Sequence, residues 1–202
     1  NQVKITAYIG TATAVTVPTR LENLPVTAIE TKAFINNMNV KLITMSDKIY
    51  TVGSEAFSGC TALTSIHLSN ALSEIPDKLF YNCTSLATVN IPSKLTDIGD
   101  SAFYRCAITS VALPSTVKTI GDSAFYECSK LTTVSISEGL INIGNYAFNG
   151  CSVLTSIILP RSLQYLGTNA FSGCTVIHIY AYTGSAAASM LTAMSIPFTA
   201  LA

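Results

Sequence analysis

Residues 120–136, IGDSAFYECSKLTTVSI, decide the fold of this chain, because most of the remaining sequence repeats them. The phenylalanine of this stretch recurs at intervals of 23 residues, with a single interval of 22. A fixed period of this length is typical of a solenoid, in which each repeat forms one coil and buries its apolar side chains against its neighbours. The seven phenylalanines are Phe34, Phe57, Phe80, Phe103, Phe125, Phe148 and Phe171.

The composition narrows the possible functions. The 202 residues include eleven basic and eleven acidic side chains, so the chain has no basic excess with which to bind nucleic acid or an anionic membrane. The mean hydropathy is high, at +0.46, yet no apolar run approaches the roughly 20 residues that span a bilayer. We therefore expect one elongated domain with a continuous apolar core, no nucleic-acid partner and no membrane-spanning segment.

Each repeat contains two kinds of segment. Three apolar positions, such as Leu131, Val134 and Ile136, follow the pattern L-x-x-I-x-L, which predicts one strand of a parallel sheet on the inner face of the stack. The residue three positions before each phenylalanine is always Thr, Ser, Asp or Asn, which are the residue types that cap helices. This position predicts a short helical turn or loop on the outer face of each coil.

The two ends of the chain depart from the repeat. Val3, Ile5, Ala7 and Ile9 alternate with polar residues, and a second alternation precedes Pro18, so we expect a strand pair forming an N-terminal β cap over residues 1–25. Repeats of about 23 residues should then occupy residues 26–180. Helix-forming residues fill 186–194, which indicates a helical cap over residues 181–202.

The repeated phrase A-F-x-x-C-x-x-L-T-x-[IV]-x-[IL]-P, present as AFYECSKLTTVSIS and AFNGCSVLTSIILP, resembles the BspA-like leucine-rich repeats of surface and secreted proteins from anaerobic and gut or oral bacteria. The resemblance extends over residues 8–200. It implies a right-handed solenoid that serves as a non-enzymatic binding scaffold, without a cofactor, on a secreted or cell-surface protein. The implied partner is a protein, such as a host extracellular-matrix protein or another surface protein, or a glycan. The sequence departs from the family pattern at Asn37, Leu79 and the shortened coil around Ile108.

Six cysteines occupy one position of the repeat. An even number of cysteines in a secreted protein suggests disulfides, but equivalent side chains on stacked strands stay parallel at about 4.8 Å. A disulfide requires converging Cβ atoms about 3.8 Å apart, and zinc requires four converging ligands. We therefore predict a buried column of free thiols, made of Cys60, Cys83, Cys106, Cys128, Cys151 and Cys174.

Other polar residues give no sign of catalysis. Asp77, Asp100 and Asp122 should stack and could hold calcium, but Thr, Ser and Asn fill the same column in other coils, so capping explains the position better. His67 and His178 should lie about 24 Å apart and cannot share a proton or a metal. Serine-hydrolase, phosphate-loop and zinc-protease motifs are missing from the sequence. We expect a protein that is not an enzyme.

Two surfaces remain as candidate binding sites. The first is the inner face, which should display small uncharged residues between the buried strand positions, although it offers few of the aromatic and arginine anchors that usually carry affinity. The second is an aromatic edge beside the phenylalanine column, which could contact a sugar or a protein or simply pack on itself. The alternative is a spacer or stalk that presents another domain outside this sequence. The inner face comprises Thr44, Ser65, His67, Thr88, Asn90, Ser110, Ala112, Thr133, Ser135, Ser156, Ile158 and His178, and the aromatic edge comprises Tyr81, Tyr104 and Tyr126.

Overall fold

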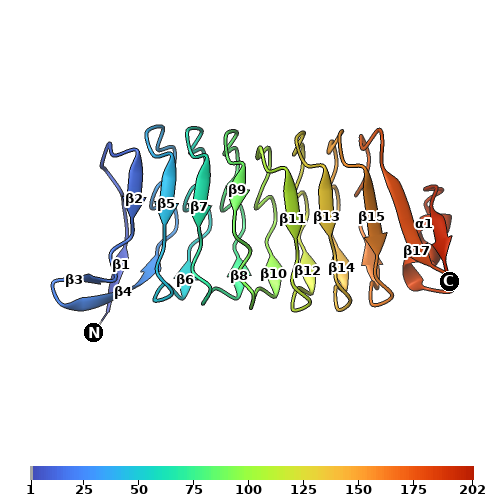
Figure 1. The fold of residues 1–202 in the computed structure, drawn as a ribbon, viewed down its shortest axis with the longest axis horizontal. Coiled ribbons are helices and arrows are strands. Elements are labelled where there is room, and N and C mark those ends of the chain that lie inside the picture. Colours follow the sequence, from blue (N-terminus) through green and yellow to red (C-terminus); the bar gives the residue numbers. More distant parts are fainter. Residues whose placement is uncertain (1) are drawn as a thin grey trace.

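The computed structural model describes residues 2–202 and has the form of a parallel β-solenoid of about nine turns. The coils follow one another along the long axis, with the two termini at opposite ends (Figure 1). This architecture confirms the predicted solenoid. It arises because each coil of about 23 residues has an apolar side that only a neighbouring coil can cover.

Strands of the L-x-x-I-x-L segments form two parallel sheets side by side, whose exposed side is called the inner face below. Most of the predicted positions are buried, since Ile66, Leu68 and Ile157 are at most 2% exposed, whereas Ile136 is half-buried. The four-stranded sheet contains β2 (Ala14–Thr16), β5 (Leu42–Thr44), β7 (Ser65–His67) and β9 (Thr88–Val89), and the five-stranded sheet contains β11 (Ser110–Ala112), β13 (Thr133–Ser135), β15 (Ser156–Leu159), β17 (His178–Tyr182) and β18 (Thr199–Leu201).

The two inner sheets are separate because one coil is a residue short. Only Ala107 stands between Cys106 and Ile108, whereas each of the other cysteines is three positions before a leucine or isoleucine. Strand β11 therefore pairs with β13 but not with β9, and a space separates β9 from β11 in Figure 1. Within residues 2–202, the backbone N–H groups of Ala107, Ile108 and Thr109 have no hydrogen-bond partner.

A second row of short strands lines another side of the solenoid, and the sequence did not predict it. These strands are two residues long in the regular coils, since a glycine or proline turn follows each one. Two sheets result. The first contains β1 (Val3–Ile5), β3 (Arg20–Leu21), β4 (Leu24–Ile29) and β6 (Thr51–Val52), and the second contains β8 (Glu74–Ile75), β10 (Asp97–Ile98), β12 (Thr119–Ile120), β14 (Asn142–Ile143) and β16 (Tyr165–Leu166).

The N-terminal region differs from the predicted strand pair. Strand β1 pairs with β4, and β2 pairs with β5, so the two N-terminal strands belong to different sheets of an incomplete first coil. Ile9 lies outside β1 and is 96% exposed. Strands β3 and β4 form an antiparallel hairpin, and β4 crosses the boundary expected at residue 25.

The outer segment of each coil, called the outer turn, is a run of tight turns rather than a helix. Residues two before and two after each phenylalanine have positive φ, as at Ser101 (φ 55°) and Arg105 (φ 57°), and this conformation interrupts a right-handed helix. Alternate backbone N–H groups donate to carbonyls within the same turn, as that of Ala102 does to the Gly99 carbonyl (3.3 Å). The N–H groups between them donate to carbonyls of the next coil, as that of Phe103 does to the Ala124 carbonyl (2.8 Å). These inter-coil bonds form what we call the outer ladder.

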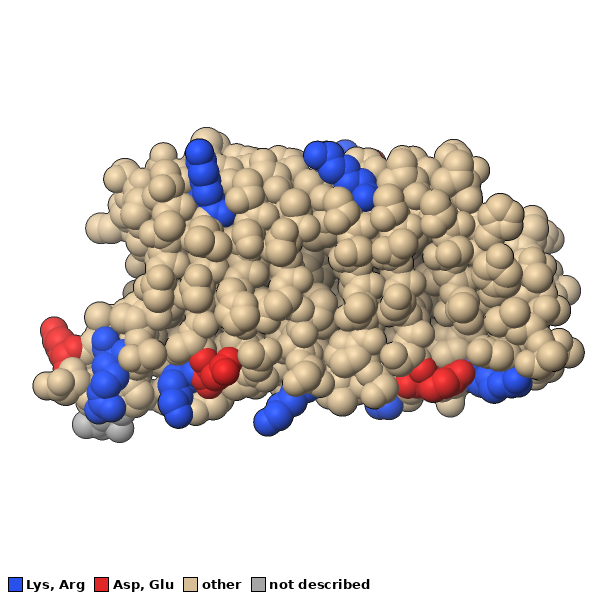
Figure 2. Space-filling model, viewed as in Figure 1, with Lys and Arg blue, Asp and Glu red and all other residues tan. Residues whose placement is uncertain are grey.

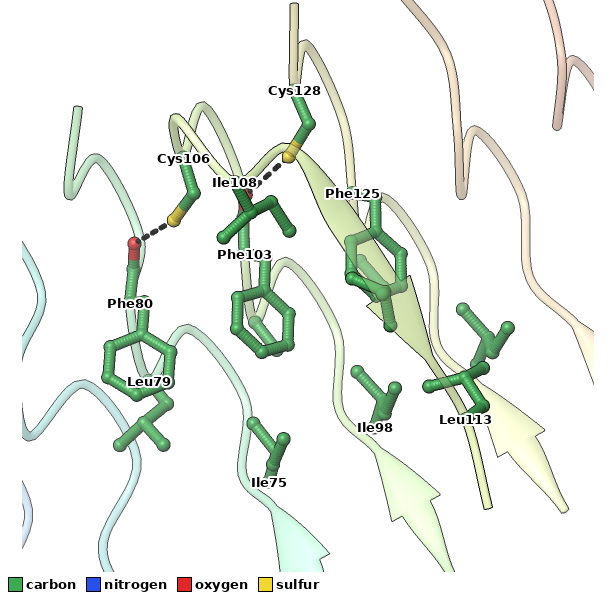
Figure 3. Packing of buried hydrophobic residues seen from close by; sticks show 14 of the residues in the cluster. Ile75, Leu79, Phe80, Ile98, Phe103, Cys106, Ile108, Leu113, Phe125 and Cys128 are labelled. Carbon is green, nitrogen blue, oxygen red and sulfur yellow. Dashed lines mark hydrogen bonds between the residues drawn. The ribbon is translucent and has the colours of Figure 1, made fainter. Parts of the chain in front are cut away.

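The phenylalanines form a continuous stack through the core. Successive rings lie 5.1–5.8 Å apart from Phe34 to Phe171, and Tyr8 extends the stack at the N-terminal end with its ring 4.8 Å from that of Phe34. Figure 3 shows Phe80, Phe103 and Phe125 in this column, with apolar side chains of the strands around them. Aromatic stacking and burial therefore join every coil to the next.

The predicted C-terminal helix is present as α1 (Ala186–Ala193). The Ser185 hydroxyl accepts the N–H of Ala188 and so caps the helix. Ala187 and Leu191 are buried, and α1 packs against β16 and β17. The helix and β18 thus cover the sheet side of the last coil.

Candidate functional site

The inner face carries its predicted residues in register. Ser110 pairs with Thr133, Thr133 with Ser156, and Ser156 with His178 across β11, β13, β15 and β17. Their side chains are exposed, as are those of Ala112, Ser135 and Ile158 in the neighbouring column. In the view of Figure 2, charged side chains lie along the two long rims, and the broad middle of that side has none.

The N-terminal half of the inner face is less open. His67 and Thr88 are exposed, while Thr44 and Ser65 are half-buried. The Asn90 amide accepts the N–H of Leu68 (2.6 Å) and donates to its carbonyl (3.0 Å). Asn90 therefore takes the place of backbone pairing between two coils, and its side chain is committed to the fold.

Larger side chains at the C-terminal end of the inner face escaped the sequence analysis. Tyr180 is half-buried and pairs with Ile158, which is 50% exposed. The guanidinium of Arg161 lies 4.0 Å from the ring centre of Tyr182. The alternation His-Ile-Tyr-Ala-Tyr at residues 178–182 was the available signal, because period two places Tyr180 and Tyr182 on the same face as His178.

The aromatic edge forms a second continuous stack. The rings of Tyr81 and Tyr104 are 4.6 Å apart, and those of Tyr104 and Tyr126 are 4.8 Å apart with an angle of 2°. Arg105 lies beside Tyr104, 5.3 Å from its ring centre, and donates to Glu127 at 2.6 Å. The three half-buried tyrosines thus pack on one another, which was one of the two possibilities that the sequence left open. One edge of the column is exposed to solvent.

All six cysteines are buried free thiols, as predicted. Each thiol donates to the carbonyl of the phenylalanine in the preceding coil, as Cys128 to Phe103 at 3.0 Å (Figure 3). Burial raises the pKa of the Cys60 thiol from its ordinary value of 9.0 to about 11 and that of Cys128 to about 12. Cys60 and Cys128 are therefore protonated structural donors and poor nucleophiles.

The acidic column has a structural role different from helix capping. The Asp77 carboxylate accepts the N–H of Asp100, Asp100 accepts that of Asp122, and Asp122 accepts that of Asn145, at 2.7–2.8 Å. Each side chain thus fixes the next coil instead of its own turn. Among residues 2–202, no group of three or more His, Cys, Asp or Glu side chains could hold a metal ion. His67 and His178 lie on strands of different inner sheets and do not come together.

The repeat that builds these surfaces matches a known family. The model of the BspA type leucine-rich repeat region matches residues 27–107 and 96–186, in six copies. The chain belongs to this family. BspA-type repeats form the whole stack between the two end regions, and such repeats generally serve as protein-interaction modules on a non-enzymatic scaffold.

Two solved structures support this assignment of the BspA-type chain. A leucine-rich repeat protein of T. pallidum is 30% identical over 98% of this chain and 91% of its own, with a TM-score of 0.82. A leucine-rich cell surface protein of Faecalibacterium prausnitzii A2-165 is also 30% identical, with a TM-score of 0.82, over 90% of this chain and 50% of its own. No curated protein matches the chain. None of the helices among residues 2–202 has the length and apolar character that crossing a membrane requires.

Proposed function

We propose that this chain is a non-enzymatic binding module of a secreted or cell-surface protein and that it contacts a protein or glycan partner through the inner face. Family membership supports the general role, since leucine-rich repeats generally bind proteins. The cell-surface description of the Faecalibacterium structure supports the location. Host extracellular-matrix proteins are the first partners to test.

The observation that carries the proposal is the exposed column Ser110, Thr133, Ser156 and His178, held in register by backbone pairing. Small uncharged side chains on a rigid sheet let a flat partner approach closely. These side chains also lose little conformational entropy when the partner binds. Tyr180 is paired with Ile158 at one end of this surface and supplies the aromatic anchor that such interfaces usually need.

The alternative is a structural spacer or stalk that presents another domain of a longer protein. The continuous stacks of phenylalanine and tyrosine rings favour this role, because they join the coils into one stiff rod. A spacer requires only length and stiffness and makes no demand on the inner face.

Binding of the purified chain to an array of extracellular-matrix proteins and glycans separates the two functions. A double variant, Ser110→Arg and Ser135→Arg, places two large charges on exposed positions of the inner face. If the inner face is the site, the double variant should lose binding at least tenfold, a free-energy difference of about 1.4 kcal/mol or more.

The matched control is Ser129→Arg, an exposed serine outside the strands. This variant should bind as the unmodified chain does. Equal binding by the double variant would exclude the inner face, and no binding by the unmodified chain to any partner would favour the spacer.

A further inference from the structure

The stack of coils ends in an incompletely covered groove at its C-terminal end. The groove has a volume of ≈ 540 Å³ and lies between the outer turn of the last coil and the segment after α1. The cap formed by α1 covers β16 and β17, but it does not replace the outer turn of a further coil. The apolar lining residues are Phe171, Cys174, Ile177, Ile179, Met194, Ile196 and Pro197.

Backbone donors of the last outer turn are left without partners. In the preceding coils, the outer ladder satisfies three N–H groups per coil; Ser123, Phe125 and Glu127, for example, donate to the next coil at 2.7–2.8 Å. The equivalent groups of the last coil belong to Asn169, Phe171 and Gly173. None of these three N–H groups has a hydrogen-bond partner within residues 2–202.

The phenylalanine stack also stops at this groove. The ring centres of Phe171 and Phe148 lie 5.7 Å apart, and among residues 2–202 no ring stacks on the other face of Phe171. Its side chain is 7% exposed, whereas Phe148 is fully buried. The groove therefore combines an open ring, apolar walls and three aligned donors.

The interfaces between coils define what fits such a groove. At each of them, three alternate carbonyls of one segment accept the outer-ladder bonds, and an aromatic side chain stacks on the preceding ring. A segment outside the regular repeats already continues the stack at its N-terminal end. There the ring of Tyr8 stacks on Phe34, and the backbone N–H of Tyr8 donates to the Ala33 carbonyl at 2.7 Å. The accepting carbonyls stand at alternate residues of an outer turn, as those of Asn145, Ala147 and Asn149 do.

We propose that the C-terminal groove binds a segment of a partner polypeptide that adopts the conformation of an outer turn. An aromatic side chain of that segment stacks on Phe171, and alternate carbonyls accept the N–H groups of Asn169, Phe171 and Gly173. The occupant continues the interface between coils by one step. Seven of the ten lining residues are apolar and none is charged, so the segment is apolar and neutral at its centre. This site is separate from the inner face and does not depend on the function proposed for it.

The test uses an acetylated and amidated peptide with the sequence of residues 121–127, GDSAFYE, added to the full chain labelled with nitrogen-15. We expect saturable amide shifts centred on Asn169, Phe171 and Gly173. The same peptide with alanine at its phenylalanine should bind at least about tenfold more weakly, because hot-spot aromatic contacts are worth 1.4 kcal/mol or more.

Variants locate the binding on the chain. Met194→Glu places a charge in the groove and should weaken peptide binding about tenfold; Pro197→Glu, at an exposed lining residue, tests the same wall. The control is Val153→Glu, which matches Met194 in exposure (38% and 39%) but lies outside the groove, and it should bind the peptide normally.

Three results would overturn the proposal: no shifts at millimolar peptide, shifts centred elsewhere, or normal binding by both groove variants. Shifts of the three amides that appear with rising protein concentration alone would identify a second copy of this chain as the occupant and would also overturn it.

Discussion

At the scale of single residues, the six thiols show how one repeated side chain holds several coils. Each phenylalanine carbonyl that receives a thiol from the next coil also receives the N–H of the residue three positions later in its own coil. The Phe103 carbonyl, for example, accepts the N–H of Cys106 at 3.0 Å and the thiol of Cys128 at 3.0 Å. Asn37 stands in the cysteine position of the first full coil, where its amide reaches the Gly10 carbonyl at 3.3 Å. A polar donor is therefore kept at this position even where the cysteine is missing.

The buried thiols should make the protein sensitive to alkali. The pKa values of Cys60 and Cys128 are raised in the folded chain, so the unfolded chain loses these protons first as the pH rises above 9. Their stabilising contribution is complete below pH 9 and is lost between pH 9 and about 11–12, at up to about 1.4 kcal/mol per pH unit per thiol. Urea unfolding between pH 7 and 11 measures this slope.

Cys128→Ser provides the control for this pH dependence. Serine keeps a donor to the Phe103 carbonyl and does not ionise in this range, so the variant should be less stable at pH 7 but should lose less stability as the pH rises. An unchanged slope would show that the thiols do not cause the alkaline sensitivity.

At the scale of the element, the glycines before the outer turns make room for the acidic column. A Cβ on Gly144 would lie 2.5 Å from an Asp122 carboxylate oxygen and 2.6 Å from the Asp122 backbone nitrogen. Because real Cβ atoms do not approach so closely, the carboxylate-to-backbone bond from Asn145 requires a residue without a side chain at this step. Glycine and aspartate are therefore one structural unit shared by two coils.

Gly144→Ala should destabilise the chain by about 2–3 kcal/mol, since overpacking against backbone cannot be relieved by a rotamer change. The loss is measured by urea unfolding. Asp122→Ala alone should cost only about 1 kcal/mol, the usual value of one hydrogen bond. Combining the two changes should restore little stability, and full recovery in the double variant would show that the clash involves the carboxylate alone.

The sequence predicted the strands of the inner face better than the other two sides of each coil. Positions such as Ile66 and Ile157 alternate with exposed residues, and this alternation alone defines a strand. The outer turns were predicted as helical because Asp and Ser caps also occur at helix starts. Positive φ at non-glycine residues such as Ser101 depends on hydrogen bonds to the neighbouring coil, so the residues next to it in the sequence do not reveal it. The second row of strands escaped prediction because two residues are too few to show a period.

The candidate site was predictable in the same uneven way. Ser110 and Thr133 followed from alternation within the repeats and are exposed as expected. Tyr180 was missed, although period two places it on the same face as His178, because the predicted inner face ended at His178. Asn90 was assigned to the binding face, but its amide pairs with the backbone of Leu68, a contact between coils that the sequence does not reveal.

At the scale of the whole molecule, the missing residue near Ala107 divides the inner sheet while the sheet of β8 to β16 and the outer ladder continue past it. The junction between β9 and β11 is thus held by backbone bonds on two of its three sides, as is the junction between β6 and β8, where the second row of strands is interrupted. Opening of the solenoid should begin at these two junctions, because local unfolding follows the fewest protecting bonds.

Insertion of one serine between Ala107 and Ile108 restores the regular spacing and should join the two inner sheets. We expect the Thr109 amide to exchange with deuterium more slowly and the Tm to rise by about 2–4 °C, the shift that 1 kcal/mol gives in a chain of this length. Inserting a serine after Ser129, in a coil of regular length, should lower the Tm. An unchanged exchange rate at Thr109 would contradict the assignment of the break to the missing residue.

The direction of the outer ladder gives the two ends of the molecule different electrical character. All of its N–H groups point toward the C-terminal end and all of its accepting carbonyls point toward the N-terminal end, as Phe125 and Ala147 illustrate. Aligned peptide dipoles add, as they do along a helix. A chain with no net charge therefore carries a partial positive pole at Asn169, Phe171 and Gly173, and electron-rich groups are attracted to that end without any lysine or arginine.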